Sequence, residues 1–565
     1  MEHMVLTEKR AEEAAVRERM SAAGAVNGRN LEKLLKDNKD TEFGRKYDFA
    51  SIRTAEDYRK RVPLSGYEEL RPWIERMLAG EERVLTVYPP AGFCLTSGTE
   101  GGSKYIPVSH EALERYSDQI EWYKNRAHRQ AGGKRLFVNS FRVGLWEEKK
   151  EYLLSELYYQ RLFREGSLTF EEYAGGEETL FVPHCRDILY VKAWTALAEE
   201  SITTIESIFL YDQLLFFRYL QKNWRELLEH MTAGHIPESV EIPEKVKRHL
   251  LSFQVGEERL ARIAEECGKG FEGIAPRLWK GLTLSGGISA ASFELEEREV
   301  RRYLGNTPLY YFAYVASECH MGVAMQAEDC RYAMLPDSAF YEYLPWRPGK
   351  EPDTAPGGET LLPHEVRPGE LYEVVLTNFC GLYRYRLGDV VRVTGFEGES
   401  PVVEFVLRKN QLLNVAGEKV SILQAEEAVR MLAGKRGLPI RRYCMAELAW
   451  DFPACYGAVF ELGQPDAASE RIAADPFRSC EKPACAAGQA ARWLDEALGE
   501  QNLDYRDVRE MGFLAEPQLL FLDEEAYAAF LTEAGMTGGH GKPRHMAGAF
   551  PEELWRKWSG RAADV

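Results

Sequence analysis

The feature that most constrains this chain is a loop of glycines and hydroxyl side chains that directly follows a short apolar run. Residues 92–95 read Gly-Phe-Cys-Leu, which is typical of a β-strand, and residues 96–104 read Thr-Ser-Gly-Thr-Glu-Gly-Gly-Ser-Lys. Glycines let main-chain N–H groups approach an anion closely, and hydroxyls and a lysine add donors. The loop therefore favours a site for nucleotide phosphates. It is not a Walker motif, because Tyr105 follows Lys104, and a flexible surface turn is the alternative.

The length and composition indicate a large, ordered α/β enzyme. The chain has 565 residues, which corresponds to roughly two to four domains. Hydrophobic residues make up 45% and charged residues 28%, so long disordered regions are not expected and sizeable cores can form. Apolar strand-like runs alternate with helical patterns along the chain, and this alternation favours the α/β class.

The charge and the distribution of apolar residues exclude several partners. The formal net charge is −18, which disfavours nucleic acid and anionic membranes as partners, because both need a basic surface. No apolar run is long enough to span a membrane, and the first 20 residues have no apolar core typical of a secretory signal. The 10 cysteines are scattered without CxxC pairs, so we expect a reducing, cytoplasmic location and no zinc site.

The pattern of the chain changes near residue 411. Before it, strand-like runs at 335–344, 370–377 and 390–394 predict a mostly antiparallel unit inside a large domain. After it, helical patterns and short strands predict a smaller α+β domain. We therefore expect two domains, at residues 1–410 and 411–565.

Two further motifs suggest contacts with the base and with a metal ion. The run Leu284-Ser285-Gly286-Gly287-Ile288 presents bare main chain, against which adenine can lie, although a tight turn is the simpler explanation. Tyr314 can stack on a base, and Glu318 follows the apolar run 309–315. A carboxylate at the end of a buried parallel strand would hold Mg²⁺ with phosphate oxygens; its alternatives are a solvated side chain or a helix N-cap.

Three motifs towards the C-terminus suggest contacts with ribose and phosphate. Gly388 allows a turn that presents Asp389, whose carboxylate can accept two hydrogen bonds from ribose hydroxyls; an ordinary hairpin turn is equally consistent. Arg408 lies at the proposed domain boundary and can contact phosphate or ribose, and a solvated linker is the alternative. Lys542 lies in a glycine-rich loop that can bring it into the site, although a lone lysine is usually solvated.

Together these motifs resemble the adenylate-forming superfamily and, within it, the auxin-responsive Gretchen Hagen family of acyl acid amido synthetases. The likeness includes the segment Tyr67–Met77, the run Leu335-Pro336-Asp337, the run Tyr343-Leu344-Pro345 and the run Asp504-Tyr505-Arg506, and it extends over roughly residues 25–550. The resemblance implies a large N-terminal α/β domain that contains β-sheets and a β-barrel-like subdomain, and a smaller, mobile α+β C-terminal domain.

The resemblance also implies a role for each motif residue. Catalytic roles would fall to Lys542, Glu318 and Lys104, and Glu318 would also be the metal ligand. The nucleotide would be bound by Thr96, Ser97, Gly98, Thr99, Lys104, Gly286, Gly287, Tyr314, Ser317, Asp389 and Arg408.

The implied reaction uses ATP and Mg²⁺. A carboxylic acid attacks the α-phosphate to give an acyl-adenylate and pyrophosphate, and an amine, in this family an amino acid, then displaces AMP. A monomer that binds these small molecules is expected. An acyl- or aryl-CoA ligase would share the first step, and a nucleotide-binding module without turnover would keep only the pocket. The acid and the amine stay open, because Cys319-His320-Met321 differs from the family pattern.

Overall fold

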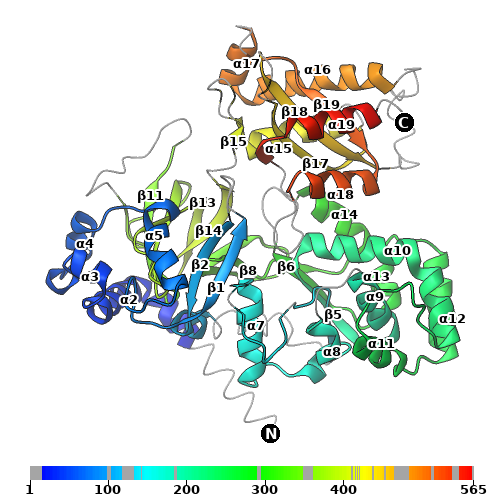
Figure 1. Cartoon of the computed structure of the whole chain (residues 1–565), viewed down its shortest axis with the longest axis horizontal. Helices are drawn as coiled ribbons and strands as arrows, with labels where there is room; N and C mark the ends of the chain where they lie inside the picture. Colours follow the sequence, from blue (N-terminus) through cyan, green and yellow to red (C-terminus); the bar gives the residue numbers. More distant parts are fainter. Residues whose placement is uncertain are drawn as a thin grey trace. The chain divides into compact units, whose positions relative to one another are not determined.

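The computed structural model of the chain describes residues 15–97, 103–116, 133–141, 143–149, 151–182, 187–288, 294–347, 360–408, 412–413, 415, 418, 420–435, 438–448, 450, 453–463, 483–510, 514–536 and 546–562. The chain divides into two compact units (Figure 1). The larger comprises Met1–Thr96, Lys104–Ser289 and Glu297–Val406. The smaller comprises Ser97–Ser103, Ala290–Glu296 and Leu407–Val565.

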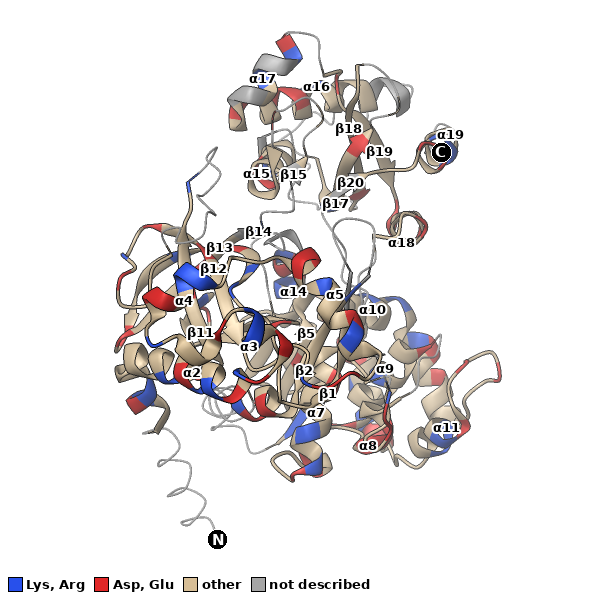
Figure 2. Cartoon of the chain, turned by 60° about the vertical axis from the view of Figure 1, so that its left-hand side comes forward, with Lys and Arg blue, Asp and Glu red and all other residues tan. Residues whose placement is uncertain are grey.

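Short helices open the larger unit, and local capping explains where one of them begins. The side chain of Thr54 accepts a hydrogen bond from the N–H of Asp57, and Asp57 accepts one from the N–H of Thr54, which together form a capping box. Basic and acidic residues share the surfaces of helices such as α2 and α11 (Figure 2). The first helices are α2 (Ala23–Asn38), α3 (Glu42–Lys46), α4 (Ala55–Arg61) and α5 (Tyr67–Leu78).

A four-stranded sheet in the larger unit has the order β3-β5-β6-β7, and its neighbouring strands are parallel. The strands are β3 (Lys134–Phe137), β5 (Ile202–Phe209), β6 (Leu284–Ile288) and β7 (Leu309–Tyr310). The connecting region contains the helices α7 (Leu154–Arg164), α8 (Glu177–Leu180), α9 (Ile188–Ala198), α10 (Leu210–Ala233), α11 (Glu244–Leu251), α12 (Glu257–Gly268), α13 (Ile274–Leu278) and α14 (Glu294–Leu304). Strand β5 extends to Phe209, and α10 begins directly after it at Leu210.

The apolar run 309–315, expected as one strand, is divided between two sheets. Phe312 has φ 34°, an uncommon value for a residue with a side chain, and it lies between β7 and β8. After this break, β8 joins a seven-stranded sheet of order β11-β12-β13-β14-β10-β9-β8. The strands are β8 (Ala313–Ala316), β9 (Cys319–Ala324), β10 (Arg331–Met334), β11 (Ala339–Pro345), β12 (Leu371–Asn378), β13 (Tyr385–Glu397) and β14 (Ser400–Arg408). The predicted antiparallel pairing of 335–344, 370–377 and 390–394 is confirmed.

The seven-stranded sheet is strongly curled. Strands in a flat sheet lie about 4.8 Å apart, so β8 would lie about 19 Å from β13, four positions away. Nevertheless, the hydroxyl of Tyr314 on β8 donates a hydrogen bond of 2.9 Å to Asp389 on β13. Register shifts in the β8–β9 and β12–β13 pairs are consistent with this curl, because bulges increase local twist. Side chains thus join the two parts, but the described strands form an open sheet, so the expected barrel is not closed.

A three-stranded sheet of order β2-β1-β4 flanks the glycine-rich loop. Its strands are β1 (Pro90–Ser97), β2 (Ser103–Ser109) and β4 (Glu151–Tyr152). The predicted strand before the loop is confirmed, but a second strand follows it, and helix appears only from residue 110. About 20 Å of extended chain separates Lys104 from that helix. Strand β2 therefore separates the N-terminus of this helix from the loop. Its first turn is instead capped by Ser109 Oγ, which accepts from the N–H of Ala112.

The smaller unit has the predicted α+β character. Its four-stranded sheet has the order β19-β18-β17-β20, and a short antiparallel pair, β15 and β16, precedes it in the chain. The strands are β15 (Leu412–Leu413), β16 (Val420–Ser421), β17 (Ile440–Leu448), β18 (Cys455–Leu462), β19 (Gln518–Leu522) and β20 (Met546–Ala549). The helices are α15 (Ile422–Lys435), α16 (Pro483–Gln501), α17 (Leu503–Glu510), α18 (Glu524–Glu533) and α19 (Glu552–Ala562).

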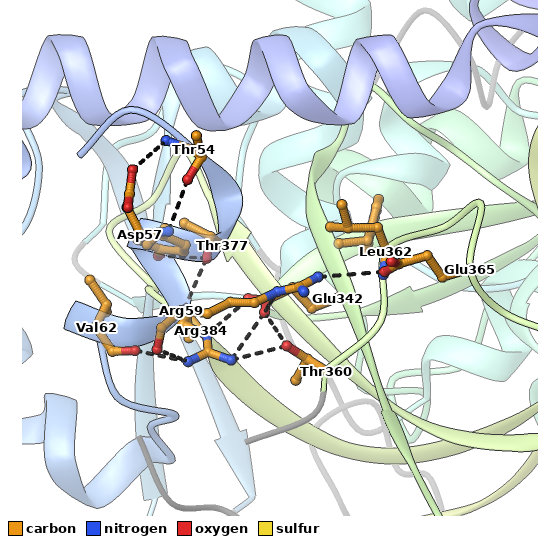
Figure 3. A network of polar contacts seen from close by, with 12 residues as sticks. Thr54, Asp57, Arg59, Val62, Glu342, Thr360, Leu362, Glu365, Thr377 and Arg384 are labelled. Atoms are coloured by element: carbon orange, nitrogen blue, oxygen red, sulfur yellow. Dashed lines mark hydrogen bonds and ion pairs between the residues drawn. The ribbon is translucent and has the colours of Figure 1, made fainter. Parts of the chain in front are cut away.

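A buried ion pair joins the N-terminal helices to the curled sheet (Figure 3). Arg384, immediately before β13, donates to both carboxylate oxygens of Glu342 on β11 at 3.0 Å. It also donates to the carbonyls of Arg59 and Val62 and to Thr360 Oγ1. Arg384 and Glu342 are completely buried. All three of its guanidinium nitrogens thus donate to groups within the protein.

Replacing Arg384 should be far more damaging than breaking a surface ion pair. We expect Arg384→Leu to lower the free energy of unfolding by about 3–5 kcal/mol, because the buried Glu342 loses its two-bond partner and keeps the longer ion pair with Arg59 at 3.3 Å. Arg392→Leu is the control, because the Arg392–Glu404 pair is exposed and should contribute less than about 1 kcal/mol. Denaturant unfolding of both variants measures the difference. Equal losses would contradict this role for Arg384.

The lysine on α9 is buried, and no carboxylate is among its hydrogen-bond partners in the described part of the chain. Lys192 is 1% exposed, and its Nζ donates to the carbonyl of Thr179 at 2.6 Å. Burial lowers the pKa of Lys192 to about 7. The unfolded chain, in which this lysine has its ordinary pKa, therefore binds more protons between about pH 7 and pH 10. In that range, the contribution of Lys192 makes the folded state more stable as the pH rises.

Lys192→Met should remove this pH dependence. From pH 7 to pH 9, the lysine should add about 2–3 kcal/mol to the free energy of unfolding, at 1.4 kcal/mol per pH unit. Lys192→Met should not show this rise in the free energy of unfolding, and it should be more stable than the original chain at pH 7. Urea unfolding at both pH values measures it, with the exposed Lys245→Met as control. If Lys192→Met and Lys245→Met respond alike to pH, the prediction is wrong.

Candidate functional site

Glu318 lies with Ser317 in the tight turn between β8 and β9. This location differs from the expected one, because the turn belongs to an antiparallel hairpin and not to the end of a parallel strand. Both residues are partly exposed. The Glu318 carboxylate accepts a hydrogen bond from the hydroxyl of Tyr385 at 3.2 Å, and its main-chain carbonyl accepts one from Asn378 Nδ2 at 2.7 Å. The turn is thus held by side chains of β12 and β13.

Asp389 lies on β13, immediately after a glycine in the left-handed region. Gly388 has φ 81°, a value that side-chain-bearing residues rarely adopt, so the glycine that the sequence singled out is needed for the main chain. The Asp389 side chain is 1% exposed and accepts the Tyr314 hydroxyl at Oδ2. The ring of Tyr314 lies beside those of Tyr332 and Phe405, at centroid distances of 6.0 and 6.1 Å.

Two hydrogen bonds between β8–β9 and β13 therefore run in opposite directions. Tyr314 on β8 holds Asp389 on β13, and Tyr385 on β13 holds Glu318 after β8. The predicted motifs around residues 314–318 and 383–391 thus meet in the larger unit, although they lie on strands that are not neighbours in the sheet.

Lys104 begins the strand after the glycine-rich loop, where it packs on an aromatic ring. Its Nζ lies 5.4 Å from the ring centroid of Tyr67, whose hydroxyl accepts from the N–H of Tyr105 at 3.0 Å. Burial raises the pKa of the Cys94 thiol on β1 well above its ordinary value, and the nearby Cys380 and Glu318 raise it further.

The two glycines of the adenine motif lie within β6 rather than after it, and both are buried. A Cβ at Gly286 would come within 2.4 Å of the Phe312 ring, and one at Gly287 within 2.8 Å of Ser207 Oγ. Glycine is therefore required here for packing within the protein. The carbonyl of Gly286 accepts from Gln213 Nε2 at 2.8 Å.

The other sequence-predicted site residues are placed only in part. Thr96 and Ser97 end β1, and Arg408 ends β14. Gly98, Thr99 and Lys542 lie outside the described residues.

Two further polar side chains of the larger unit have partners within the protein. Arg115 forms an ion pair of 2.8 Å with Glu111 and stacks on Phe379, with its Cζ 3.8 Å from the ring centroid. The buried His320 ring is stacked on Tyr116 at 4.7 Å. These contacts favour a packing role for Arg115 and His320.

Sequence reasoning missed three residues of the site: Tyr67, Asn378 and Tyr385. Tyr385 lies inside a motif that was singled out, but its contact with Glu318 depends on the curl of the sheet. Asn378 ends a predicted strand, and a buried asparagine at a strand end is a signal that the main chain nearby needs a hydrogen-bond partner.

Within the part of the chain that the structure describes, no three histidine, cysteine, aspartate or glutamate side chains form a group suited to a metal ion. A single carboxylate such as Glu318 fits Mg²⁺ when phosphate and water supply the other ligands. A search of the described residues found no helix that could cross a membrane.

The Tyr314–Asp389 hydrogen bond should contribute measurably to stability. Tyr314→Phe should lower the free energy of unfolding by about 1.5–3 kcal/mol, because a buried carboxylate loses a donor. Tyr343→Phe is a matched control, since its buried hydroxyl has no hydrogen-bond partner among the described residues. Thermal or denaturant unfolding of the two variants tests the difference. A loss for Tyr314→Phe no larger than that for Tyr343→Phe would refute the prediction.

Comparison with known proteins shows matches along most of the chain. The models of the GH3 family N-terminal, central and C-terminal domains match residues 13–309, 332–408 and 423–548. Jasmonoyl-L-amino acid synthetase GH3.5 of Oryza sativa subsp. japonica is 28% identical over 446 residues, which cover 73% of this chain and 76% of that protein. Indole-3-acetic acid-amido synthetase GH3.8 of Oryza sativa subsp. indica is 27% identical over 480 residues, covering 81% and 78%.

Solved structures show the same fold. The AtGH3.15 acyl acid amido synthetase in complex with 2,4-DB matches with a TM-score of 0.81 and 21% identity, covering 98% of this chain and 96% of that one. A 2-hydroxyisobutyryl-CoA ligase in the postadenylation state matches with a TM-score of 0.52 and 13% identity, covering 97% and 93%. The chain has the fold shared by these adenylate-forming enzymes, and the domain matches along its length show that it belongs to the GH3 family.

Proposed function

We propose that this chain is an ATP-dependent acyl acid amido synthetase. It would activate a carboxylic acid as an acyl-adenylate, release pyrophosphate, and transfer the acyl group to the amine of an amino acid. The observation that supports this most is the pair of carboxylates, Glu318 and Asp389, held together in the larger unit by Tyr314 and Tyr385. The names of its GH3 relatives supply the reaction class.

Each carboxylate suits a different part of ATP. Asp389 is oriented by one tyrosine and would accept the ribose hydroxyls. Glu318 lies on a partly exposed turn and would bind Mg²⁺, which when bound offsets the charge of the phosphates. Lys104 and the loop that includes Ser97, Gly98 and Thr99 would bind the phosphates.

The remaining proposed contacts come from both parts of the chain. Gly286 and Gly287 would border the adenine, with Tyr314, and Arg408 would support the nucleotide. Lys542 would stabilise the negative charge that develops at the α-phosphate during adenylation. In this proposal, residues 1–410 bind ATP and the acid, and residues 411–565 bring in Lys542. The side chains position reactants and stabilise charge, and no activated nucleophile is needed. Consistent with this, burial raises the pKa of the Cys380 thiol to about 11.

A second candidate is an acyl- or aryl-CoA ligase, which would pass the same adenylate to a thiol. The structural match to 2-hydroxyisobutyryl-CoA ligase favours considering it, because the fold alone serves both acceptors. The sequence relatives that are named as amido synthetases favour the amine. AMP release in the presence of amino acids or of coenzyme A would separate the two activities.

Exchange of labelled pyrophosphate into ATP, with Mg²⁺ and a panel of aryl, indole and fatty acids, tests adenylation directly. Lys542→Ala should lower the exchange rate by about 100-fold or more and leave ATP affinity largely unchanged, because the lysine acts on developing charge. Lys557→Ala is the control, since Lys557 forms an exposed ion pair with Glu533 in the same unit and should retain full activity.

Two outcomes would count against the proposal. Exchange that is unchanged in Lys542→Ala would remove the role assigned to that lysine. If ATP binds but no acid in the panel supports exchange, the chain would behave as a nucleotide-binding module without turnover.

A further inference from the structure

We propose that Asn378 is a positioning residue for the adenylation site, acting through the main chain of Glu318. This inference rests on the proposed function and names a residue that it did not assign. Asn378 ends β12 and is completely buried. Its Nδ2 donates a hydrogen bond of 2.7 Å to the carbonyl of Glu318, in the turn between β9 and β8, which lie four and five positions from β12 in the sheet order.

The orientation of the Asn378 amide is set by its other contacts. Its Oδ1 accepts hydrogen bonds from the N–H groups of Cys380 and Leu382, at 2.9 and 3.0 Å. Because two N–H donors identify that atom as the oxygen, the NH₂ group must be the one that faces Glu318. The Asn378 oxygen thus stabilises the loop after β12, and the NH₂ group of the same side chain holds the Glu318 turn.

That loop joins the parts of the site that lie in the larger unit. Ser109, at the end of β2, donates from Oγ to the carbonyl of Phe379 at 2.7 Å. Lys104 begins the same strand, and Asp389 lies on the strand that follows the loop. Asn378 therefore connects the strand of the phosphate-binding lysine, the strand of the ribose-binding carboxylate and the turn of the metal-binding carboxylate.

The Glu318 turn needs such a tether. It connects β8 and β9, and β8 is a short strand at the edge of the sheet, paired on one side only with β9. Turns at sheet edges usually move more than the strands they join. Asn378 makes the shorter of two hydrogen bonds to the main chain of this turn, at 2.7 Å against 3.4 Å from the Tyr116 hydroxyl. The Tyr385 hydroxyl, 3.2 Å from the carboxylate, holds the side chain. Together they would fix the direction in which Glu318 presents its charge.

Asn378→Asp tests the tether with little change in shape. The new side chain keeps an acceptor for Cys380 and Leu382 but places an oxygen against the Glu318 carbonyl, so the tether is lost. It also adds a buried carboxylate, and the control must match that change. Asn27→Asp is a matched control. Asn27 is 2% exposed, and it likewise accepts from one main-chain N–H and donates to one main-chain carbonyl, both of Tyr341.

The expected result separates positioning from stability. Asn378→Asp should lower kcat for pyrophosphate exchange about ten-fold, the effect of one lost hydrogen bond. It should raise the Mg²⁺ concentration needed for half-maximal exchange by several-fold, and leave the Kd for ATP without Mg²⁺ within about two-fold. Asn27→Asp should behave as the original chain does in all three measurements.

Calorimetric titration of ATP, with and without Mg²⁺, provides a readout that does not depend on turnover. In the original chain, Mg²⁺ should tighten ATP binding, and in Asn378→Asp most of that gain should be lost. Should Asn378→Asp fail to fold, Tyr385→Phe provides the second variant, because it removes the other contact that directs the carboxylate. It should also shift the Mg²⁺ requirement upwards.

Each alternative outcome has a distinct meaning. An unchanged Mg²⁺ dependence and kcat in Asn378→Asp would overturn the inference, and so would an equal loss in Asn27→Asp, which would reveal a general effect of a buried carboxylate. If no acid in the panel supports pyrophosphate exchange by the original chain, the proposed function fails. The calorimetric titration then tests the role of Asn378 by itself. If Mg²⁺ does not then affect ATP binding by the original chain, the inference fails as well.

Discussion

The buried ion pair between Arg384 and Glu342 is the interaction on which the site depends. Arg384 has φ 43°, which is costly for a residue with a side chain, so surrounding contacts must hold it there. Its N–H donates to Thr377 Oγ1, and its guanidinium contacts Glu342 and the carbonyls that end α4 (Figure 3). This conformation determines how the chain enters β13. Because Tyr385 follows at once and Asp389 lies on the same strand, the geometry of the site depends on this pair.

The curl of the seven-stranded sheet then brings the two motifs together. Main-chain hydrogen bonds link each strand only to its neighbours, so they cannot join β8 to β12 or β13. Tyrosine and asparagine side chains make that connection, with donors from β8, β12 and β13. The side-chain hydrogen bonds connect distant strands as in a barrel, whereas the main-chain hydrogen bonds of the described strands form an open sheet. Side chains are sensitive to single substitutions in a way that a main-chain ladder is not, and this makes the connection testable.

The sequence predicted the helices and strands better than the way in which they pair and pack. The α/β class, the antiparallel strands after residue 335 and the strand before the glycine-rich loop were all found, because alternating and apolar runs report local structure. The division of the run 309–315 at Phe312 was missed, since no residue there is a usual turn former. Strand β5 was also missed, because its threonines, glutamate and serine interrupt the apolar pattern, although the strand is almost fully buried.

The same difference applies to the site. Glu318 and Asp389 were predicted because their motifs contain chemistry that can be read from residue types. Their tethers were not, because Asn378 and Tyr385 act across the curl of the sheet, which has no local signature. The glycines of β6 were singled out because bare main chain can lie against adenine, and Phe312 and Ser207 add a packing reason for glycine that the sequence did not indicate.

Tyrosine hydroxyls orient the two candidate site carboxylates, whereas guanidinium groups pair with two carboxylates elsewhere in the curled sheet. Glu342 and Glu373 accept hydrogen bonds from the guanidinium groups of Arg384 and Arg386, which offset their charge. Asp389 and Glu318 accept from tyrosine hydroxyls, which orient a carboxylate without cancelling its charge. A site that must attract a metal ion or hydrogen-bond a ribose needs acceptors that are fixed in direction and still negative. Neutral donors meet both needs, and a neutral amide on the Glu318 carbonyl extends the same principle to the main chain.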